Sequence, residues 1–340
     1  MKFADGTERP CSTFVWSIDA GFARAVASDS GPTLPQLVGY TTDGSGLLMT
    51  GIWSSFTTVP RSTVIAPRVA QTNTIVAPFD FVVVGGGGVG ARVPNGALLT
   101  RTERTGWSQW TVSTQDTPEF PELHNNQTLV IGMKIEGLAR EELAAMVTVT
   151  EAPSGVNATN HPHAEVLPPL GHVVLGGGAV SRSLAFPQFG QLLTMSAPIP
   201  ILMGFCWQGR CGEDSGAIGW RAQSKDHLTP APGWVIVSVV SMPDQIDLDG
   251  QRFRVEQYAR GVTSPIAAHP TIIVPGMSGQ FALTGVGGRA NWPPPQAGSL
   301  LWQLLPRPDL AGVQVSSKDH GWPSPVSITG YTIGVRLVPE

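Results

Sequence analysis

Charge is scarce in this sequence. Only 14% of the 340 residues are Asp, Glu, Lys or Arg, where roughly 25% is typical of soluble domains. The net charge of −4 gives no basic surface of the kind that binds nucleic acid, so we expect no nucleic-acid partner. The hydrophobic share of 41% is ordinary, which favours a folded core over disorder.

Long apolar runs and cysteines are also few. No run of about 18 apolar residues is present that could span a membrane, and the N-terminus lacks the basic and apolar segments of a signal peptide. We therefore expect a soluble protein made in the cytoplasm, which would leave the cell only by non-classical release. Three cysteines define no disulfide framework, and the sequence leaves open whether Cys206 and Cys211 form a disulfide.

Helix-compatible stretches are rare, because 40 residues are Gly and 30 are Pro. Only residues 137–146 are typical of one or two helical turns. Apolar, β-branched segments at 129–135, 234–240 and 328–335 lie between turn residues and indicate strands. The sequence therefore predicts an all-β protein.

What the sequence does contain is a threefold internal repeat. The string Ser-Lys-Asp-His occurs at 224–227 and 317–320, and a weaker copy, Thr-Gln-Asp-Thr, occupies 114–117. Each copy has a Gly-x-Leu-Leu element upstream, preceded by a glycine cluster that follows an apolar strand. The Gly-x-Leu-Leu elements lie at 96–99, 190–193 and 298–301, and the glycine clusters at 82–88, 173–178 and 281–288. Copies of about 100 residues indicate duplication.

The repeat sets the expected boundaries. Residues 1–57 would supply N-terminal strands that complete the fold, followed by copies at 58–150, 151–241 and 242–340. Copy two is longer by an inserted loop within 195–219, which is either neutral drift or a recognition loop, because loops accept insertions at small cost. Three such units favour a β-prism-like closure with pseudo-threefold symmetry, and three tandem β-sandwich units are the alternative.

The combined pattern of glycine cluster, G-x-LLT and W-x-x-x-SKDH resembles three-repeat bacterial β-modules. These modules resemble the prism-type receptor-binding domains of bacterial insecticidal toxins and lectins. The resemblance implies a glycan- or receptor-binding module rather than a catalyst, with a toxin partner or a homo-oligomer. Copy one departs from the motif at Gln115 and Thr117, so a site built on Lys and His is not implied there.

Candidate ligand-binding residues are the polar residues of the motif and the tryptophans near it. Asp and His can hydrogen-bond to sugar hydroxyls beside an aromatic platform. These candidates are Asp116, Lys225, Asp226, His227, Lys318, Asp319, His320, Trp110, Trp220 and Trp322.

Structural interpretations compete with this one. The aspartates could cap turns through backbone N–H groups, the lysines could pair with aspartates of a neighbouring copy, and the tryptophans could belong to the core. Copies two and three also share a lead-in that contains a His-Pro pair, at 161–162 and 269–270. Each alternative assigns the motif to packing rather than to recognition.

The motif does not predict catalysis. On a strand, Lys225 and His227 share one face while Ser224 and Asp226 share the other, so the side chains do not converge on one point. No spaced set of metal ligands or phosphate-binding loop is present, and we expect no metal or cofactor. The leading hypothesis is a non-enzymatic module that binds carbohydrate or a glycosylated surface receptor. A structural protein such as a fibre, tail or coat component is the alternative, and a hydrolase is third.

Overall fold

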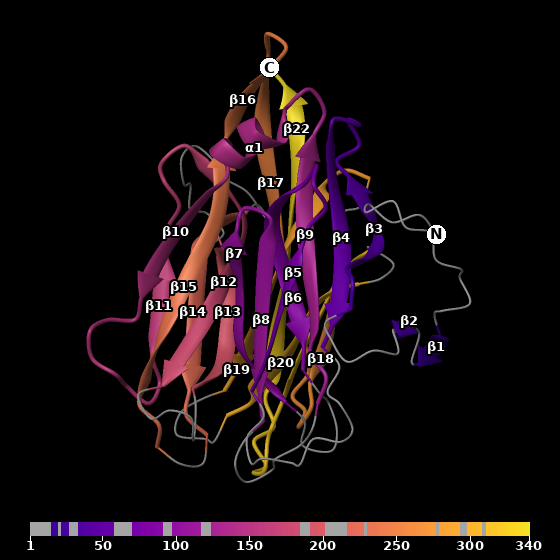
Figure 1. The fold of residues 1–340 in the computed structure, drawn as a ribbon. Helices are drawn as coiled ribbons and strands as arrows, with labels where there is room; N and C mark the ends of the chain where they lie inside the picture. The colour runs from indigo at the N-terminus through magenta and orange to yellow at the C-terminus, as the bar shows by residue number, and fades with distance from the viewer. Residues whose placement is uncertain are drawn as a thin grey trace.

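The fold is described by a computed structural model. It covers residues 33–57, 70–90, 97–116, 124–183, 191–200, 216–227, 230–276, 279–292, 298–307 and 311–340, together with the backbone of 15–19 and 22–26. Over these residues the chain is all-β, with three antiparallel sheets, a separate hairpin of β1 (Val15–Asp19) and β2 (Phe22–Val26), and one short helix, α1 (Arg140–Met146) (Figure 1). The predicted all-β class is confirmed, and the helix lies within the predicted helical turns at 137–146.

The first sheet has six strands in the order β10-β15-β12-β7-β8-β5. Their bounds are β10 (Thr148–Pro153), β15 (Gly233–Pro243), β12 (His172–Ser183), β7 (Leu98–Gly106), β8 (Gln109–Gln115) and β5 (Ala70–Val76). The sheet therefore combines β15 and β12 of copy two with three strands of copy one, and β10 spans the boundary between these two copies.

The second sheet has seven strands in the order β11-β14-β13-β19-β22-β17-β16. Their bounds are β11 (His163–Val166), β14 (Ala217–Lys225), β13 (Leu192–Pro200), β19 (Ala282–Asn291), β22 (Ser327–Pro339), β17 (Gln251–Thr263) and β16 (Gln245–Leu248). Here copy two contributes three strands and copy three contributes four.

The third sheet has the order β18-β21-β20-β6-β9-β4-β3. Its strands are β18 (Thr271–Pro275), β21 (Gly312–Lys318), β20 (Leu300–Pro306), β6 (Val82–Val89), β9 (Gln127–Ile135), β4 (Leu48–Phe56) and β3 (Gln36–Thr42). Copy three pairs with copy one, and the N-terminal segment supplies the last two strands, β4 and β3.

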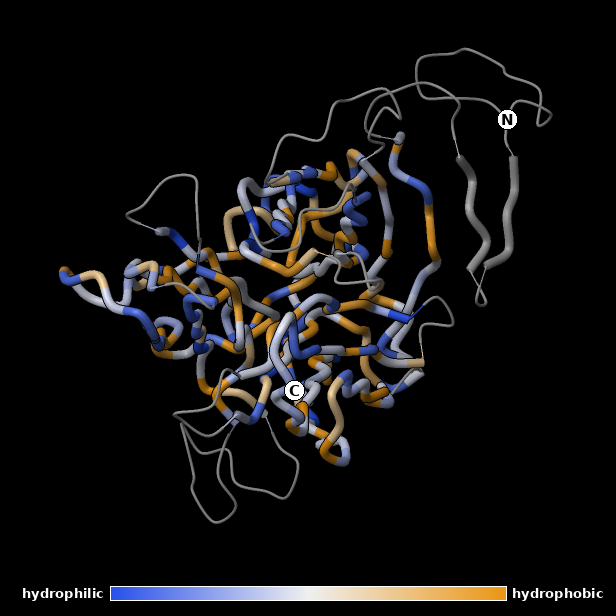
Figure 2. Tube along the Cα trace, turned by 90° about the horizontal axis from the view of Figure 1, so that it is seen from below, coloured by the Kyte–Doolittle hydropathy of each residue, from blue (hydrophilic) through white to orange (hydrophobic). Residues whose placement is uncertain are grey.

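Every sheet thus joins two copies at the same kind of strand pair. The Leu-Leu strand of one copy pairs with the glycine strand of the next, through Thr102 with Ala179, Ser196 with Gly288, and Leu304 with Gly88. Each copy contributes strands to two sheets, so the copies are not separate units in strand pairing. Figure 2 shows the molecule from below, with hydrophobic and hydrophilic residues interspersed along the Cα trace.

The glycine strands need glycine because backbones from different copies approach there. A Cβ on Gly176 would lie 2.7 Å from the carbonyl oxygen of Val84, and one on Gly285 would lie 2.8 Å from that of Leu175. A Cβ on Gly85 would collide in the same way with the carbonyl oxygen of Thr284. Only glycine leaves room for such contacts.

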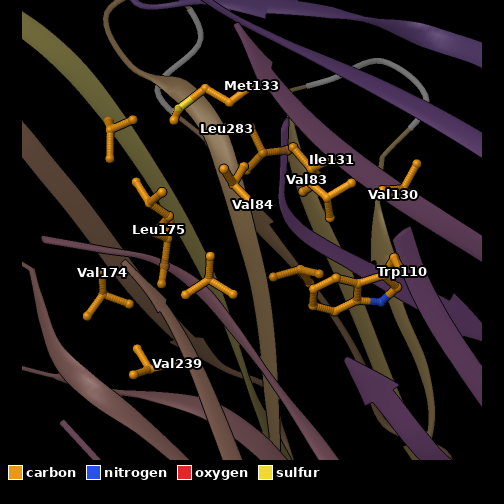
Figure 3. Packing of buried hydrophobic residues seen from close by; sticks show 14 of the residues in the cluster. Val83, Val84, Trp110, Val130, Ile131, Met133, Val174, Leu175, Val239 and Leu283 are labelled. Atoms are coloured by element: carbon orange, nitrogen blue, oxygen red, sulfur yellow. The ribbon is translucent and has the colours of Figure 1, made fainter. Parts of the chain in front are cut away.

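One hydrophobic cluster runs through all three copies. It includes Val84, Leu175 and Leu283, which lie in the same region of the core (Figure 3). A second cluster contains the first leucine of each Leu-Leu pair, and we call it the leucine junction. It consists of Leu98, Leu192, Leu300 and Trp302. The described residues include no helix long and apolar enough to cross a membrane.

Candidate functional site

The motif lies at the end of the molecule opposite the C terminus. Strands β8, β14 and β21 end at Gln115, Lys225 and Lys318, and each of these residues pairs in register with a leucine of the junction. Cross-strand partners share a face of the sheet. The two lysines and the glutamine therefore lie on the face that carries the leucine junction.

The lysines of the motif are buried. The exposed fraction is 4% for Lys225 and 1% for Lys318. The Nζ of Lys225 donates to the main-chain oxygen of Asp226 at 2.7 Å and lies 5.8 Å from the centre of the Trp292 ring. Burial disfavours the charged amine and lowers the pKa of Lys225 to about 8, although the Asp226 carboxylate opposes this shift.

The histidines of copies two and three meet. His320 Nδ1 and His227 Nε2 are 3.2 Å apart, and both side chains are buried. Burial, with further contributions from His320 and Lys225, lowers the pKa of His227 to about 3. His227 is therefore neutral at physiological pH, and the contact between the two rings joins copies two and three.

The aspartates point the other way and hold turns. Asp226 Oδ2 accepts from the N–H of Ala231 at 3.4 Å, and Asp319 Oδ2 accepts from the N–H of Ser324 at 3.3 Å. Both contacts span five residues. This arrangement matches the turn-capping interpretation for these two aspartates, and Asp116 at the equivalent position is fully buried.

The His-Pro pairs supply a second partner to the same aspartates. His161 Nε2 lies 3.5 Å from Asp226 Oδ1, and His269 Nε2 lies 3.0 Å from Asp319 Oδ1. The sequence showed that these histidines recur but assigned them no role. Their recurrence as a His-Pro pair in copies two and three was the signal that could have found them.

Trp110 and Trp220 belong to the core. Both are fully buried, and their rings lie against Gly86 and Gly177, where an ideal Cβ on Gly86 would come within 2.6 Å of the Trp110 ring. Trp110 is seen inside the packed cluster in Figure 3. Neither ring offers a face to a sugar in this structure, which is a correction to their assignment as a binding platform.

The indole N–H groups of these tryptophans are also engaged. Trp110 Nε1 donates to Thr102 Oγ1 at 3.2 Å, and Trp220 Nε1 donates to Ser196 Oγ at 3.1 Å. Trp322 differs, since 64% of its surface is exposed in the segment between β21 and β22. Of the three candidate tryptophans, Trp322 is the one that a ligand could reach.

The hydroxyl of the motif is not paired with its histidine. Ser224 Oγ donates to Gln191 Oε1 at 3.0 Å, whereas His227 contacts His320. The two side chains thus have different partners, as expected from their opposite faces on the strand. In the described part of the chain, no three His, Cys, Asp or Glu side chains are grouped as a metal site.

Sequence reasoning missed Trp292 and placed the inserted loop too broadly. Trp292 lies against Lys225 and also makes an edge contact with His161 at 5.3 Å between ring centres, but no other copy has a tryptophan at this position, so the repeat carried no signal for it. Within the predicted insertion 195–219, residues up to Pro200 continue β13 and β14 begins at Ala217. Cys206 and Cys211 lie outside the described residues.

Comparison with known proteins assigns no family. No family model matches the chain, and no curated protein matches it. The solved structure described as "The Triple Jelly Roll Fold and Turret Assembly in an Archaeal Virus" is 11% identical and covers 96% of this chain and 88% of its own, with a TM-score of 0.17. A structure of Sulfolobus Turreted Icosahedral Virus is 11% identical, covers 96% of this chain and 89% of its own, and has a TM-score of 0.15. Scores this low carry no argument about fold or function.

Proposed function

We propose that the three copies are related by a pseudo-threefold axis in a β-prism-like arrangement. Three observations support this. The copies pair with one another at equivalent strand positions, their first glycines contact one another's backbones in a cyclic order, and one leucine from each copy enters the leucine junction. Repeats that close on one another in this way form one body.

We further propose that the protein is a non-catalytic structural component of a larger assembly, such as a fibre, tail or coat. The observation that carries this proposal is the burial of the repeated polar motif. Its lysines and histidines are buried, His227 of copy two contacts His320 of copy three, and Asp226 and Asp319 hold turns. A motif used in this way serves packing, which leaves recognition to the outer surface.

The outer surface offers apolar contacts at both edges of the third sheet. On β3, a bulge between Leu37 and Gly39 places Leu37 and Tyr40 opposite Trp53 and Gly51, on one face, and about half of each side chain is exposed. On β18, Ile273 is exposed to the same degree. Exposed edge strands with apolar side chains favour association.

The position of these edges favours a ring or a filament over a closed dimer. Strands β3 and β18 are the two opposite edges of one sheet. A contact from the β3 edge of one molecule to the β18 edge of the next would use two different surfaces. Such contacts build rings or filaments.

Solution size tests the assembly proposal. Size-exclusion chromatography with light scattering should give species well above the 35.9 kDa monomer, in a concentration-dependent manner. The variant Leu37→Glu/Tyr40→Glu should shift these species to the monomer, because it places charge on the β3 edge. Val156→Glu, in an exposed segment, is the matched control and should assemble normally. A monomer at every concentration would contradict the proposal.

Recognition of carbohydrate or a glycosylated receptor is the second candidate. It is favoured by exposed Trp322, two residues after His320 of the motif. A glycan array in which a monomeric protein binds, and the Trp322→Ala variant does not, would replace the structural proposal with this one.

A further inference from the structure

Copy one differs from copy two in the segment that follows its last long strand. After β9 the chain forms α1, which lies towards the end of the molecule that carries the C terminus (Figure 1). In copy two, β15 is followed directly by β16, and α1 is the only helix among the described residues. A segment that the repeated fold does not require is a candidate for a function specific to copy one.

The first residue of α1, Arg140, lies between two aromatic rings. Its Cζ is 3.6 Å from the centre of the Trp107 ring and 4.9 Å from the centre of the Phe79 ring. Trp107 lies in the turn between β7 and β8, and Phe79 lies between β5 and β6. Three separate segments of copy one therefore meet at one guanidinium group.

Both rings are accessible from outside the molecule. The exposed fraction is 81% for Phe79 and 46% for Trp107. Aromatic side chains and arginine are the residues most enriched where proteins recognise a ligand or a partner. This cluster therefore has the composition of a recognition surface.

The guanidinium of Arg140 has aromatic neighbours but no polar partner. In the described part of the chain it makes no hydrogen bond and no ion pair. Its Nε is buried, whereas the two terminal nitrogens are not. Because the Trp107 ring lies against the face of the guanidinium, the terminal N–H groups at its edge remain for a ligand. Two such N–H groups match the two oxygens of a carboxylate.

Hydrogen bonds hold the segments of this cluster in place. Arg104 is buried, and it donates through Nε to the carbonyl oxygen of Gly106 at 3.1 Å and through Nη1 to that of Val147 at 3.5 Å. These contacts join the turn between β7 and β8 to the C-terminal end of α1. The N–H of Val83 donates to the carbonyl oxygen of Trp107 at 2.9 Å, which joins the same turn to β6. A preformed site loses less entropy when a ligand binds.

The charges around Arg140 favour a singly charged ligand. Burial lowers the pKa of Arg140, and the carboxylates of Glu141 and Asp80 oppose this shift. Asp80 also pairs with Lys134, at 3.4 Å. The two cations and two carboxylates balance, so a carboxylate meets less repulsion here than a doubly charged phosphate would.

We propose that this cluster binds a carboxylate attached to a ring. The terminal N–H groups of Arg140 donate to the carboxylate, and the exposed rings of Phe79 and Trp107 pack against the ring of the ligand. An aromatic acid and an acidic sugar both have this chemistry. The site is independent of the assembly proposed above, because it uses neither β3 nor β18.

Benzoate and glucuronate are the probes. Each is titrated at pH 7 into the full chain carrying ¹⁵N-labelled tryptophan, and the indole N–H signal of Trp107 is identified by its loss in Trp107→Phe. We expect a saturable shift of this signal with a dissociation constant on the order of 1 mM. Benzyl alcohol and glucose, which lack the carboxylate, should bind at least about tenfold more weakly. A shift with either acid supports the proposal, and the tighter binder identifies the class of ring.

The variants make the test specific to the guanidinium. Arg140→Gln should abolish the shift, and Arg140→Lys, which keeps the charge but loses the paired N–H groups, should weaken binding by about tenfold. Arg252→Gln removes an exposed arginine paired with Asp247 and should bind as the wild type does. If Arg140→Gln folds poorly, Phe79→Ala provides the comparison, because its ring is mostly exposed and its loss should weaken binding severalfold.

Four results would overturn the proposal. They are the absence of a saturable shift with both acids, equal binding of benzyl alcohol and benzoate, unchanged binding in Arg140→Gln or Phe79→Ala, and tighter binding of inorganic phosphate than of either acid.

Discussion

Replacing both Gly86 and Trp110 with valine is the sharpest test of how the copies pack. In copy one, the Trp110 ring fills the space above Gly86 and its N–H bonds to Thr102. Copy three has Val286 and Val313 at the same two positions, and both are buried. A small residue on the glycine strand thus accompanies a large one on the facing strand, and two medium residues replace them in copy three.

Each half of this exchange should be destabilising alone. Trp110→Val leaves a cavity and removes the indole N–H that donates to Thr102. Together these losses should lower the unfolding free energy by about 3 kcal/mol. Gly86→Val places a Cβ 2.6 Å from the Trp110 ring and 2.5 Å from the carbonyl oxygen of Leu129, and overpacking of this kind costs about 1–3 kcal/mol.

The double variant should recover much of the loss. Gly86→Val/Trp110→Val removes the clash with the ring and refills the cavity, so we expect a net cost of about 1–2 kcal/mol, the remainder reflecting the Leu129 oxygen and Thr102. Equilibrium unfolding in guanidinium chloride, followed by far-UV circular dichroism, gives these values. The mismatched pair Gly86→Val/Trp220→Val is the control, and its effects should add because the two sites do not touch. If the unfolding free energies of the single variants add equally well in the matched and mismatched pairs, the proposed contact between positions 86 and 110 is wrong.

Four further outcomes are expected. Neutral His227 contributes stability above pH 6.5 that is lost as the pH falls from about 6.5 towards its folded-state pKa of about 3, because only the unfolded state takes up a proton in that range. Between pH 7.5 and 4, the urea midpoint of His227→Asn should therefore fall less steeply than that of the wild type. Equal slopes for the two proteins would contradict this role of His227. Asp226→Ala should lower the unfolding free energy by about 1 kcal/mol through loss of the turn contact to Ala231, measured by urea unfolding against Asp226→Asn, which keeps an acceptor. Gly176→Val should cost more than about 3 kcal/mol, or prevent folding, since its Cβ meets a backbone oxygen that cannot rotate away; a soluble variant of wild-type melting temperature would contradict this. Trp322→Ala should change the melting temperature little, because the side chain is mostly exposed.

The core position of the tryptophans could have been predicted from the sequence. Trp110 and Trp220 align with Val313, while Gly86 and Gly177 align with Val286, so the size exchange is visible once the copies are aligned. A second exchange, Gly88 with Val112 in copy one against Ala179 with Ala222 in copy two, follows the same rule. Paired changes of this kind indicate contact, and they favour a core position over an exposed platform.

The contact between His227 and His320 and the role of Trp292 could not be predicted from the sequence. His227 and His320 are 93 residues apart, and nothing near either one specifies the other as a neighbour. Trp292 lies beside Lys225 only because copies two and three are adjacent. Such contacts depend on which copies are adjacent, and the sequence of one copy does not specify its neighbour.

The sequence by itself determined the strands, the turns and the existence of three copies. These features are local: Gly and Pro exclude long helices, alternating apolar residues form strands, and a duplicated string is recognisable wherever it lies. Only the tertiary structure decided that each copy divides its strands between two sheets, and that Lys225 and Lys318 are buried at the leucine junction. Burial depends on what lies across the interface, and strand pairing between copies is set by packing over the whole chain rather than by any segment of it.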